Sequence, residues 1–142
     1  MRITTRGRYA LRASLALAQL QKEGTPVSIN QLSEEEHISA VFLEQIFFRL
    51  RKAGIVSSVR GPGGGFLFSR PPEALTLREI LEAAGEELNV TDCDKQAKAC
   101  EGTSRRCLSH SVWEGVTRLL NDYFERLTLG EVLKRKGPPR DS

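Results

Sequence analysis

Three cysteines and a histidine lie within one short stretch of the chain, CDKQAKACEGTSRRCLSH, residues 93–110. Their spacing is Cys93-x6-Cys100-x6-Cys107-x2-His110, and these are all 3 cysteines of the chain. Three thiolates and one imidazole are enough to complete a zinc tetrahedron or the four ligand positions of a 2Fe-2S cluster. Their neighbours are mostly polar or charged, whereas structural cysteines are normally buried among apolar residues. The stretch therefore predicts a metal or cluster site, with unligated thiols in a loop as the alternative.

The first residues, MRITTRGRYALRASLALAQL, begin basic and turn apolar, as a signal peptide does. However, Arg12 interrupts the apolar run, and the apolar residues recur at three- and four-residue steps, which is typical of an amphipathic helix. We therefore expect a cytoplasmic protein with no membrane partner. In such a protein an odd number of cysteines argues against a disulfide framework, because cytosolic thiols are kept reduced.

The elements that must position the cysteine stretch follow from hydrophobic periodicity. Residues 85–108 have no clear period, so we expect a loop that takes its shape from the group it binds. A long amphipathic helix follows within 109–133, and the tail 134–142 is expected to be disordered. The apolar stripe of this helix, from Val112 to Leu127, has little of its own domain to cover it. Pairing with the same helix of a second copy would cover it, so we expect a homodimer.

Residues 1–84 are expected to form a winged helix-turn-helix domain, so the predicted fold is mainly α with a small β-hairpin wing and a long C-terminal dimerisation helix. Thr4 or Thr5 caps a first helix, Ser28 begins a second with its three glutamates outward, and Ser39 begins a third that ends at Gly54. The strands IVSSVR and FLFS flank the turn GPGGG, and a last helix is expected over 75–84. In the third helix, one face is predicted to be buried: Leu43, Ile46, Phe47 and Leu50.

Charge is distributed unevenly: residues 1–70 carry a net charge of +5 and residues 71–142 a net charge of −2, which gives +3 for the whole chain. The basic half would be attracted to a polyanion, and helix-turn-helix domains place their second helix in the major groove of DNA. The alternative is a solvated charged face. We expect phosphate contacts from the N-terminal arginines, base contacts from the third helix and a minor-groove contact from the wing. The candidate DNA-binding residues are Arg2, Arg6, Arg8, Ser39, Ala40, Glu44, Gln45, Arg49, Arg60, Gly61, Pro62, Gly63 and Gly64.

Two residues of the third helix are less typical of a DNA-binding face. Glu44 must either accept a hydrogen bond from a cytosine amino group or repel the duplex. Phe48 is expected to pack on another helix rather than on a thymine methyl group.

The usual nucleophile and phosphate-loop motifs do not occur, and GPGGG lacks the lysine and helix that a phosphate loop needs. We therefore do not expect an enzyme, although an electron-transfer subunit using the same cluster is an alternative.

Four stretches, RITTRGRYAL, FLEQIFFRLRKAGIVSSVRGPGGGF, CLSHSVW and LTLGEVL, resemble a known family. From Met1 to about Leu133 the chain is similar to the IscR-type iron–sulfur cluster regulators, within a larger family of winged-helix repressors that includes the nitric-oxide sensor NsrR. The resemblance implies a homodimeric transcription factor that binds a pseudo-palindromic operator and controls cluster assembly or related stress genes. It also implies contact with the iron–sulfur assembly machinery.

By the same resemblance, the 2Fe-2S cluster is held by Cys93, Cys100, Cys107 and His110. Glu44 matches the acidic residue that makes DNA choice depend on the cluster, and Arg60 matches the arginine of the minor groove. IscR-type proteins usually have five residues between successive cysteines, whereas this chain has six in both gaps. That difference leaves other candidates for the fourth ligand: Asp92, Asp94, Glu101 and Ser111. A repressor of the same fold that senses nitric oxide or redox state, or holds a structural zinc, is the alternative function.

Overall fold

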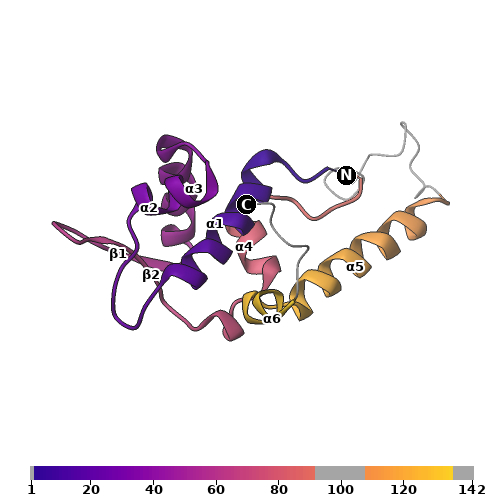
Figure 1. Cartoon of the computed structure of the whole chain (residues 1–142). Coiled ribbons are helices and arrows are strands. Elements are labelled where there is room, and N and C mark those ends of the chain that lie inside the picture. The colour runs from indigo at the N-terminus through magenta and orange to yellow at the C-terminus, as the bar shows by residue number, and fades with distance from the viewer. Residues whose placement is uncertain (1, 92–107, 136–142) are drawn as a thin grey trace.

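The computed structural model describes residues 2–91 and 108–135. Helices dominate it, and two short strands form a hairpin (Figure 1). In chain order the elements are α1 (Thr5–Leu20), α2 (Ile29–Glu36), α3 (Ala40–Lys52), β1 (Val56–Val59), β2 (Gly65–Phe68), the 3-10 turn η1 (Pro72–Ala74), α4 (Leu77–Ala83), α5 (His110–Arg126) and α6 (Leu129–Lys134).

Hydroxyl caps begin the three N-terminal helices, as predicted. The Thr4 side chain accepts a hydrogen bond from the Gly7 amide at 3.2 Å, and Ser39 Oγ accepts one from the Phe42 amide at 3.1 Å. Ser28 forms a reciprocal capping box with Gln31. These caps satisfy amides that would otherwise lack partners at the helix starts, so the helix boundaries here are set by local sequence.

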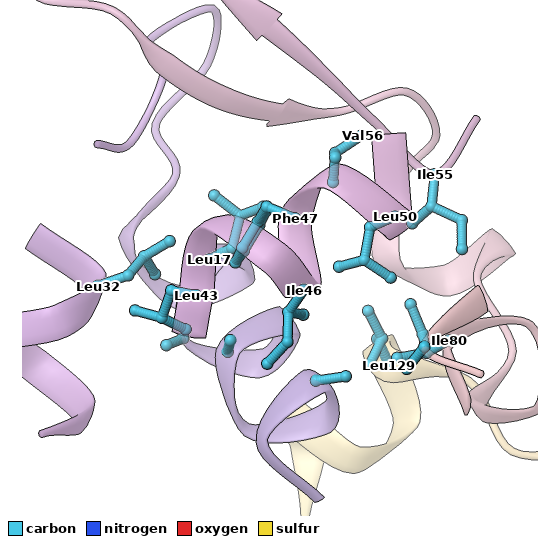
Figure 2. Packing of buried hydrophobic residues seen from close by; sticks show 14 of the residues in the cluster. Leu17, Leu32, Leu43, Ile46, Phe47, Leu50, Ile55, Val56, Ile80 and Leu129 are labelled. Atoms are coloured by element: carbon cyan, nitrogen blue, oxygen red, sulfur yellow. The ribbon is translucent and has the colours of Figure 1, made fainter. Parts of the chain in front are cut away.

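The hydrophobic core lies where α3 meets α1, α2 and α4. All four residues of the predicted stripe of α3 are fully buried, and Figure 2 shows them facing Leu17, Leu32 and Ile80. Phe47 also meets the wing, with its ring centroid 4.9 Å from that of Phe66. The core therefore holds the third helix with its opposite face outward.

The wing is a two-stranded antiparallel hairpin that projects from the helices (Figure 1). The loop after α1 adds one bridge to it, because Val27 N donates to Phe66 O at 3.0 Å and Phe66 N donates to Val27 O at 2.8 Å. A Cβ at Gly65, where φ is 155°, would overlap the Val27 carbonyl. Only glycine allows this close approach of the two backbones.

The prediction that all three glutamates of α2 face outward is wrong for Glu36, which is only 7% exposed. Arg12 of α1 lies against it, with Arg12 Nε 3.5 Å from Glu36 Oε1 and Nη2 donating to the Glu36 carbonyl at 2.6 Å. A carboxylate can be buried here because a guanidinium pairs with it. The arginine that interrupts the apolar run of α1 therefore serves a structural contact.

The last predicted helix of the winged domain begins two residues late, at Leu77, because the Thr76 and Glu79 side chains form a capping box. Leu75 instead pairs in extended form with the chain between α5 and α6. Leu77 N donates to Leu127 O, and Leu129 N donates to Leu75 O, each at 2.9 Å. Leu127 and Leu129 are consequently part of the core, and α6 is a further helix that the periodicity did not indicate.

From this junction α5 extends away from the winged domain (Figure 1). None of its residues is buried, and its apolar stripe includes Leu119, which is 70% exposed, and Tyr123, which is 52% exposed. Within the described residues, no helix has the length and apolarity needed to span a lipid bilayer.

Candidate nucleic-acid interface and the ends of the cysteine segment

The outward face of α3 presents Val41, Glu44, Gln45 and Phe48, which follow one another at i, i+3, i+4 and i+7. All four are exposed, and together with Arg6 and Arg49 they line a shallow hollow. The structure thus brings the predicted base-reading residues Gln45 and Arg49 together with Arg6 of the N-terminal arm. The caps and the buried stripe orient this face, since a helix held by one side exposes the other.

The start of α1 forms a second hollow, lined by Arg2, Ile3, Thr4, Thr5 and Arg8. Arg2 and Arg8 are exposed, whereas Arg6 is half-buried and its Nε donates to the Ala84 carbonyl at 2.5 Å. Arg8 Nη2 donates to Thr5 Oγ1 at 3.2 Å, and this bond leaves most of its guanidinium donors open to solvent. Two exposed guanidinium groups at a helix N-terminus, where the helix dipole also favours anions, suit a phosphate.

The wing tip carries Arg60 and the turn that follows it. Residues 60–63 are exposed, and the turn needs left-handed backbone at Gly61 (φ 95°) and Gly63 (φ 74°). Gly64 is half-buried against the Val59 carbonyl. Arg60 is therefore carried at the end of a narrow projection, as an arginine that enters a minor groove must be.

Phe48 differs from its prediction, because its side chain is 56% exposed instead of packed on another helix. The Arg51 guanidinium lies 5.8 Å from the centroid of its ring. Arg51 Nη1 also donates to Ser58 Oγ of β1 at 3.4 Å. The ring therefore stands on the outward face of α3 with a cation on one side. Its position at i+7 from Val41 is the sequence signal that places it there.

The segment 84–91, which leads into the cysteine stretch, binds the start of α1. Besides the contact of Ala84 with Arg6, the Glu86 carboxylate accepts hydrogen bonds from the Thr4 amide at 3.1 Å and from the Thr4 hydroxyl. Glu86 is 7% exposed and lies directly against Gly7, where a Cβ would overlap it. The sequence reading missed this residue, because Glu86 looked like one more polar residue of a loop.

The same segment then binds α5. The Leu88 carbonyl accepts from Asn121 Nδ2 at 2.8 Å, and the Val90 amide donates to Thr117 Oγ1 at 3.0 Å. Segment 84–91 thus connects the arginine-bearing start of α1 with the middle of α5, and it ends two residues before Cys93.

Of the four predicted cluster ligands, only His110 lies within the described residues; Cys93, Cys100 and Cys107 lie outside them, as do Asp92, Asp94, Glu101 and the tail from residue 136 onward. His110 is the first residue of α5, its side chain is 13% exposed, and its Nε2 is 3.7 Å from Glu114 Oε2. This distance is too long for a hydrogen bond, but the Glu114 carboxylate is near enough to attract a ring N–H, which is compatible with His110 as a ligand. The described residues hold no group of three or more His, Cys, Asp or Glu side chains suited to a metal.

Comparison with known proteins places these features in context. The family model Rrf2, described as iron-dependent transcriptional regulator, matches residues 3–135. The HTH-type transcriptional regulator IscR of Escherichia coli is 40% identical over 136 residues, which cover 96% of this chain and 82% of IscR.

Two solved structures are similar over nearly the whole chain. T. potens IscR matches with a TM-score of 0.75 at 31% identity, covering 94% of this chain and 87% of its own. The oxidized form of Staphylococcus aureus CymR matches with a TM-score of 0.76 at 26% identity, covering 97% and 100%. These likenesses confirm the expected fold, mainly α with a winged hairpin.

Proposed function

The chain belongs to the Rrf2 family of iron-dependent transcriptional regulators, and on this premise we propose that it is a homodimer that senses iron–sulfur cluster status through a 2Fe-2S cluster. Its family and relatives are transcriptional regulators rather than enzymes, as expected. The proposed targets are cluster assembly or related stress genes, the proposed compartment is the cytoplasm, and the assembly machinery is a proposed partner. The proposed ligands are Cys93, Cys100, Cys107 and His110.

Segment 84–91 is the observation that carries the proposal. On one side of the cysteine stretch this segment binds Thr4 and Arg6 at the start of α1, and on the other side His110 begins α5. A cluster held between these two ends would constrain the positions of both segment 84–91 and the start of α5. When bound, a 2Fe-2S cluster supplies a centre whose presence reports cluster supply. The protein residues would convert that signal, because shifting Glu86 shifts the start of α1 and its arginines.

The outward surface fits a duplex as follows. Arg2 and Arg8 would meet phosphates, Gln45 and Arg49 would reach base edges in the major groove, and Arg60 would enter the minor groove. Ser39, Ala40 and residues 61–64 would bring backbone close to the duplex. Two copies would read half-sites about 34–36 Å apart, so the operator should be pseudo-palindromic.

Iron and acid-labile sulfide analysis of anaerobically prepared protein tests the cluster. We expect iron and sulfide in equal amounts with visible absorbance, and loss of both from His110→Ala. Ser111→Ala removes the rival fourth ligand at the next position and should retain both; loss of iron from Ser111→Ala but not from His110→Ala would assign the fourth ligand to Ser111. Colourless protein with one zinc would contradict the proposal and favour the structural-zinc alternative.

The signalling half of the proposal has a separate test. Cluster-loaded and stripped dimers should differ in affinity for at least one class of promoter, measured by gel shift at fixed salt. If both forms bound every promoter with equal affinity, the protein would still bind DNA but the cluster would not control it, and the signalling half of the proposal would be wrong.

Redox sensing by the cysteines is a second candidate, favoured by the likeness to CymR, one of whose solved structures is an oxidized form. Under this alternative, DNA affinity would respond to oxidant in protein that contains no iron. The same gel shift with metal-free protein, with and without oxidant, distinguishes the two.

A further inference from the structure

Two large apolar side chains stand exposed on the face of α3 that we assign to DNA. Val41 is 67% exposed and Phe48 is 56% exposed. They lie at the two ends of the outward stripe, with Glu44 and Gln45 between them. Neither side chain can form hydrogen bonds with water, and neither belongs to the core. Because both side chains line one hollow, a partner that fills this hollow would cover them together.

The spacing of the two side chains fits a duplex. Seven residues of α-helix span about 10.5 Å, and this equals about three base-pair steps of roughly 3.4 Å each. Val41 in the first turn of α3 and Phe48 two turns later would therefore meet bases about three steps apart, while Glu44 and Gln45 address the bases between.

Both side chains are also held in place before any partner arrives. Val41 is β-branched, which restricts it to few rotamers in a helix. The ring of Phe48 is held on one side by Arg51, which is itself tied to Ser58 of the wing. Little side-chain entropy would thus be lost on binding.

The charges around the two side chains decide what covers them. Arg6 and Arg49 line the same hollow, and exposed Lys52 follows on α3. A cationic border with apolar contacts inside it suits the major groove, whose edges carry phosphates and whose apolar group is the C5-methyl of thymine. We propose that Val41 and Phe48 read thymine methyl groups and make the operator choice depend on thymine at two positions of each half-site. This inference rests on the proposed DNA-binding function.

The experiment begins with a duplex selected by the full-length protein from a random-site library. Each thymine of the half-site is then replaced by deoxyuridine, which removes only the C5-methyl. Wild-type protein should bind about fourfold more weakly at two positions about three steps apart, the factor expected for one methyl-sized group left unburied. Val41→Ala should abolish the difference between thymine and deoxyuridine at one of these positions, and Phe48→Ala at the other.

Two controls separate this readout from general loss of affinity. Lys52→Ala should weaken binding to thymine and deoxyuridine duplexes equally. Val59→Ala is the matched valine change, on the wing, and it should leave the ratio unchanged because the methyl group lies in the major groove. Deoxyuridine sensitivity that persists in both α3 variants, or is absent from wild type, would overturn the inference alone. A chain that selects no duplex would overturn the proposed function with it.

Discussion

At the scale of single residues, Glu44 is the least expected member of the outward face. It is an exposed carboxylate in the hollow shared with Arg6 and Arg49, on a surface otherwise suited to a polyanion. A carboxylate in the major groove can accept a hydrogen bond from a cytosine amino group, but it repels acceptors and phosphates. We therefore infer that Glu44 acts mainly by rejecting sequences.

Glu44→Ala should accordingly allow a wider range of DNA sequences to bind. At one base position, the ratio of affinities for the preferred and the rejected base should fall about tenfold or more. Selection from a random-site library measures this. Glu44→Gln is the matched control, because it keeps the size but adds a donor, and it should shift the preference at that position toward adenine. Unchanged selection by Glu44→Ala would show that the carboxylate does not face the bases.

At the scale of elements, the contact between α1 and segment 84–91 is the link through which, in the proposed function, the cysteine stretch would act on the start of α1 and its arginines. It depends on a missing side chain, because a Cβ at Gly7 would lie 2.6 Å from Glu86 Cγ. Glu86 replaces water at the Thr4 amide and hydroxyl, so displacing it leaves a helix start without its partner.

Gly7→Ala should therefore lower the free energy of unfolding by about 1 kcal/mol, although alanine in a helix normally raises it by about that amount. In a Glu86→Ala background the same substitution should stabilise the protein instead. Chemical denaturation of the four proteins gives the coupling free energy. Independent, additive effects would contradict the contact.

The start of α4 contains a second element-level contact, the capping box of Thr76 and Glu79. Burial raises the pKa of Glu79, but the Thr76 amide and the Arg70 guanidinium outweigh it and leave the pKa below its usual value of 4.5. Because the folded-state pKa is lowered, the charged carboxylate stabilises the fold above about pH 4.5, and this contribution is lost as pH falls through the lower value.

Glu79→Gln removes this charge and should lower the free energy of unfolding at pH 7 by about 0.5 kcal/mol, as for an exposed ion pair with a cap. The difference from wild type should shrink as pH falls below 4.5, where the wild-type carboxyl also becomes neutral. Thermal unfolding between pH 3 and 7 measures it. A difference independent of pH would assign the effect to shape instead of charge.

At the scale of the whole molecule, α5 is held at its C-terminal end and contacted in its middle by segment 84–91, while its apolar stripe remains exposed. Leu127 is buried in the core, and the backbone hydrogen bond of Leu129 to Leu75 attaches this end to the rest of the chain. Leu119 and Tyr123 are exposed to solvent. Packing of two such helices would cover both apolar stripes and fix the distance between the two outward α3 faces. That distance must match the spacing of the two half-sites of an operator.

Leu119→Glu should raise the dimer dissociation constant at least about a hundredfold, since a carboxylate would be buried without a partner. Sedimentation velocity measures the mass, and operator affinity should fall with it. Arg118→Glu introduces the same residue at the neighbouring position and should leave the dimer intact. A wild-type chain that sediments as a monomer at micromolar concentration would remove the basis for the proposed dimer.

Local chemistry within the sequence determined much of this protein. Hydroxyl caps at Thr4, Ser28 and Ser39 fix helix starts, and the period of α3 divides a buried from an outward face, because both effects act within a few residues. The spacing of three cysteines and His110 likewise names candidate ligands before any fold is known.

Tertiary structure alone decided which polar groups are buried and what they touch. The Arg12–Glu36 pair, the Glu86–Thr4 contact across 82 residues and the pairing of Leu75 with Leu129 all join segments distant in the chain. For a charged residue in a loop or on a polar helix face, the neighbouring sequence does not indicate whether a distant residue of opposite charge will pair with it. Only the approach of the other segment supplies that partner and makes burial favourable.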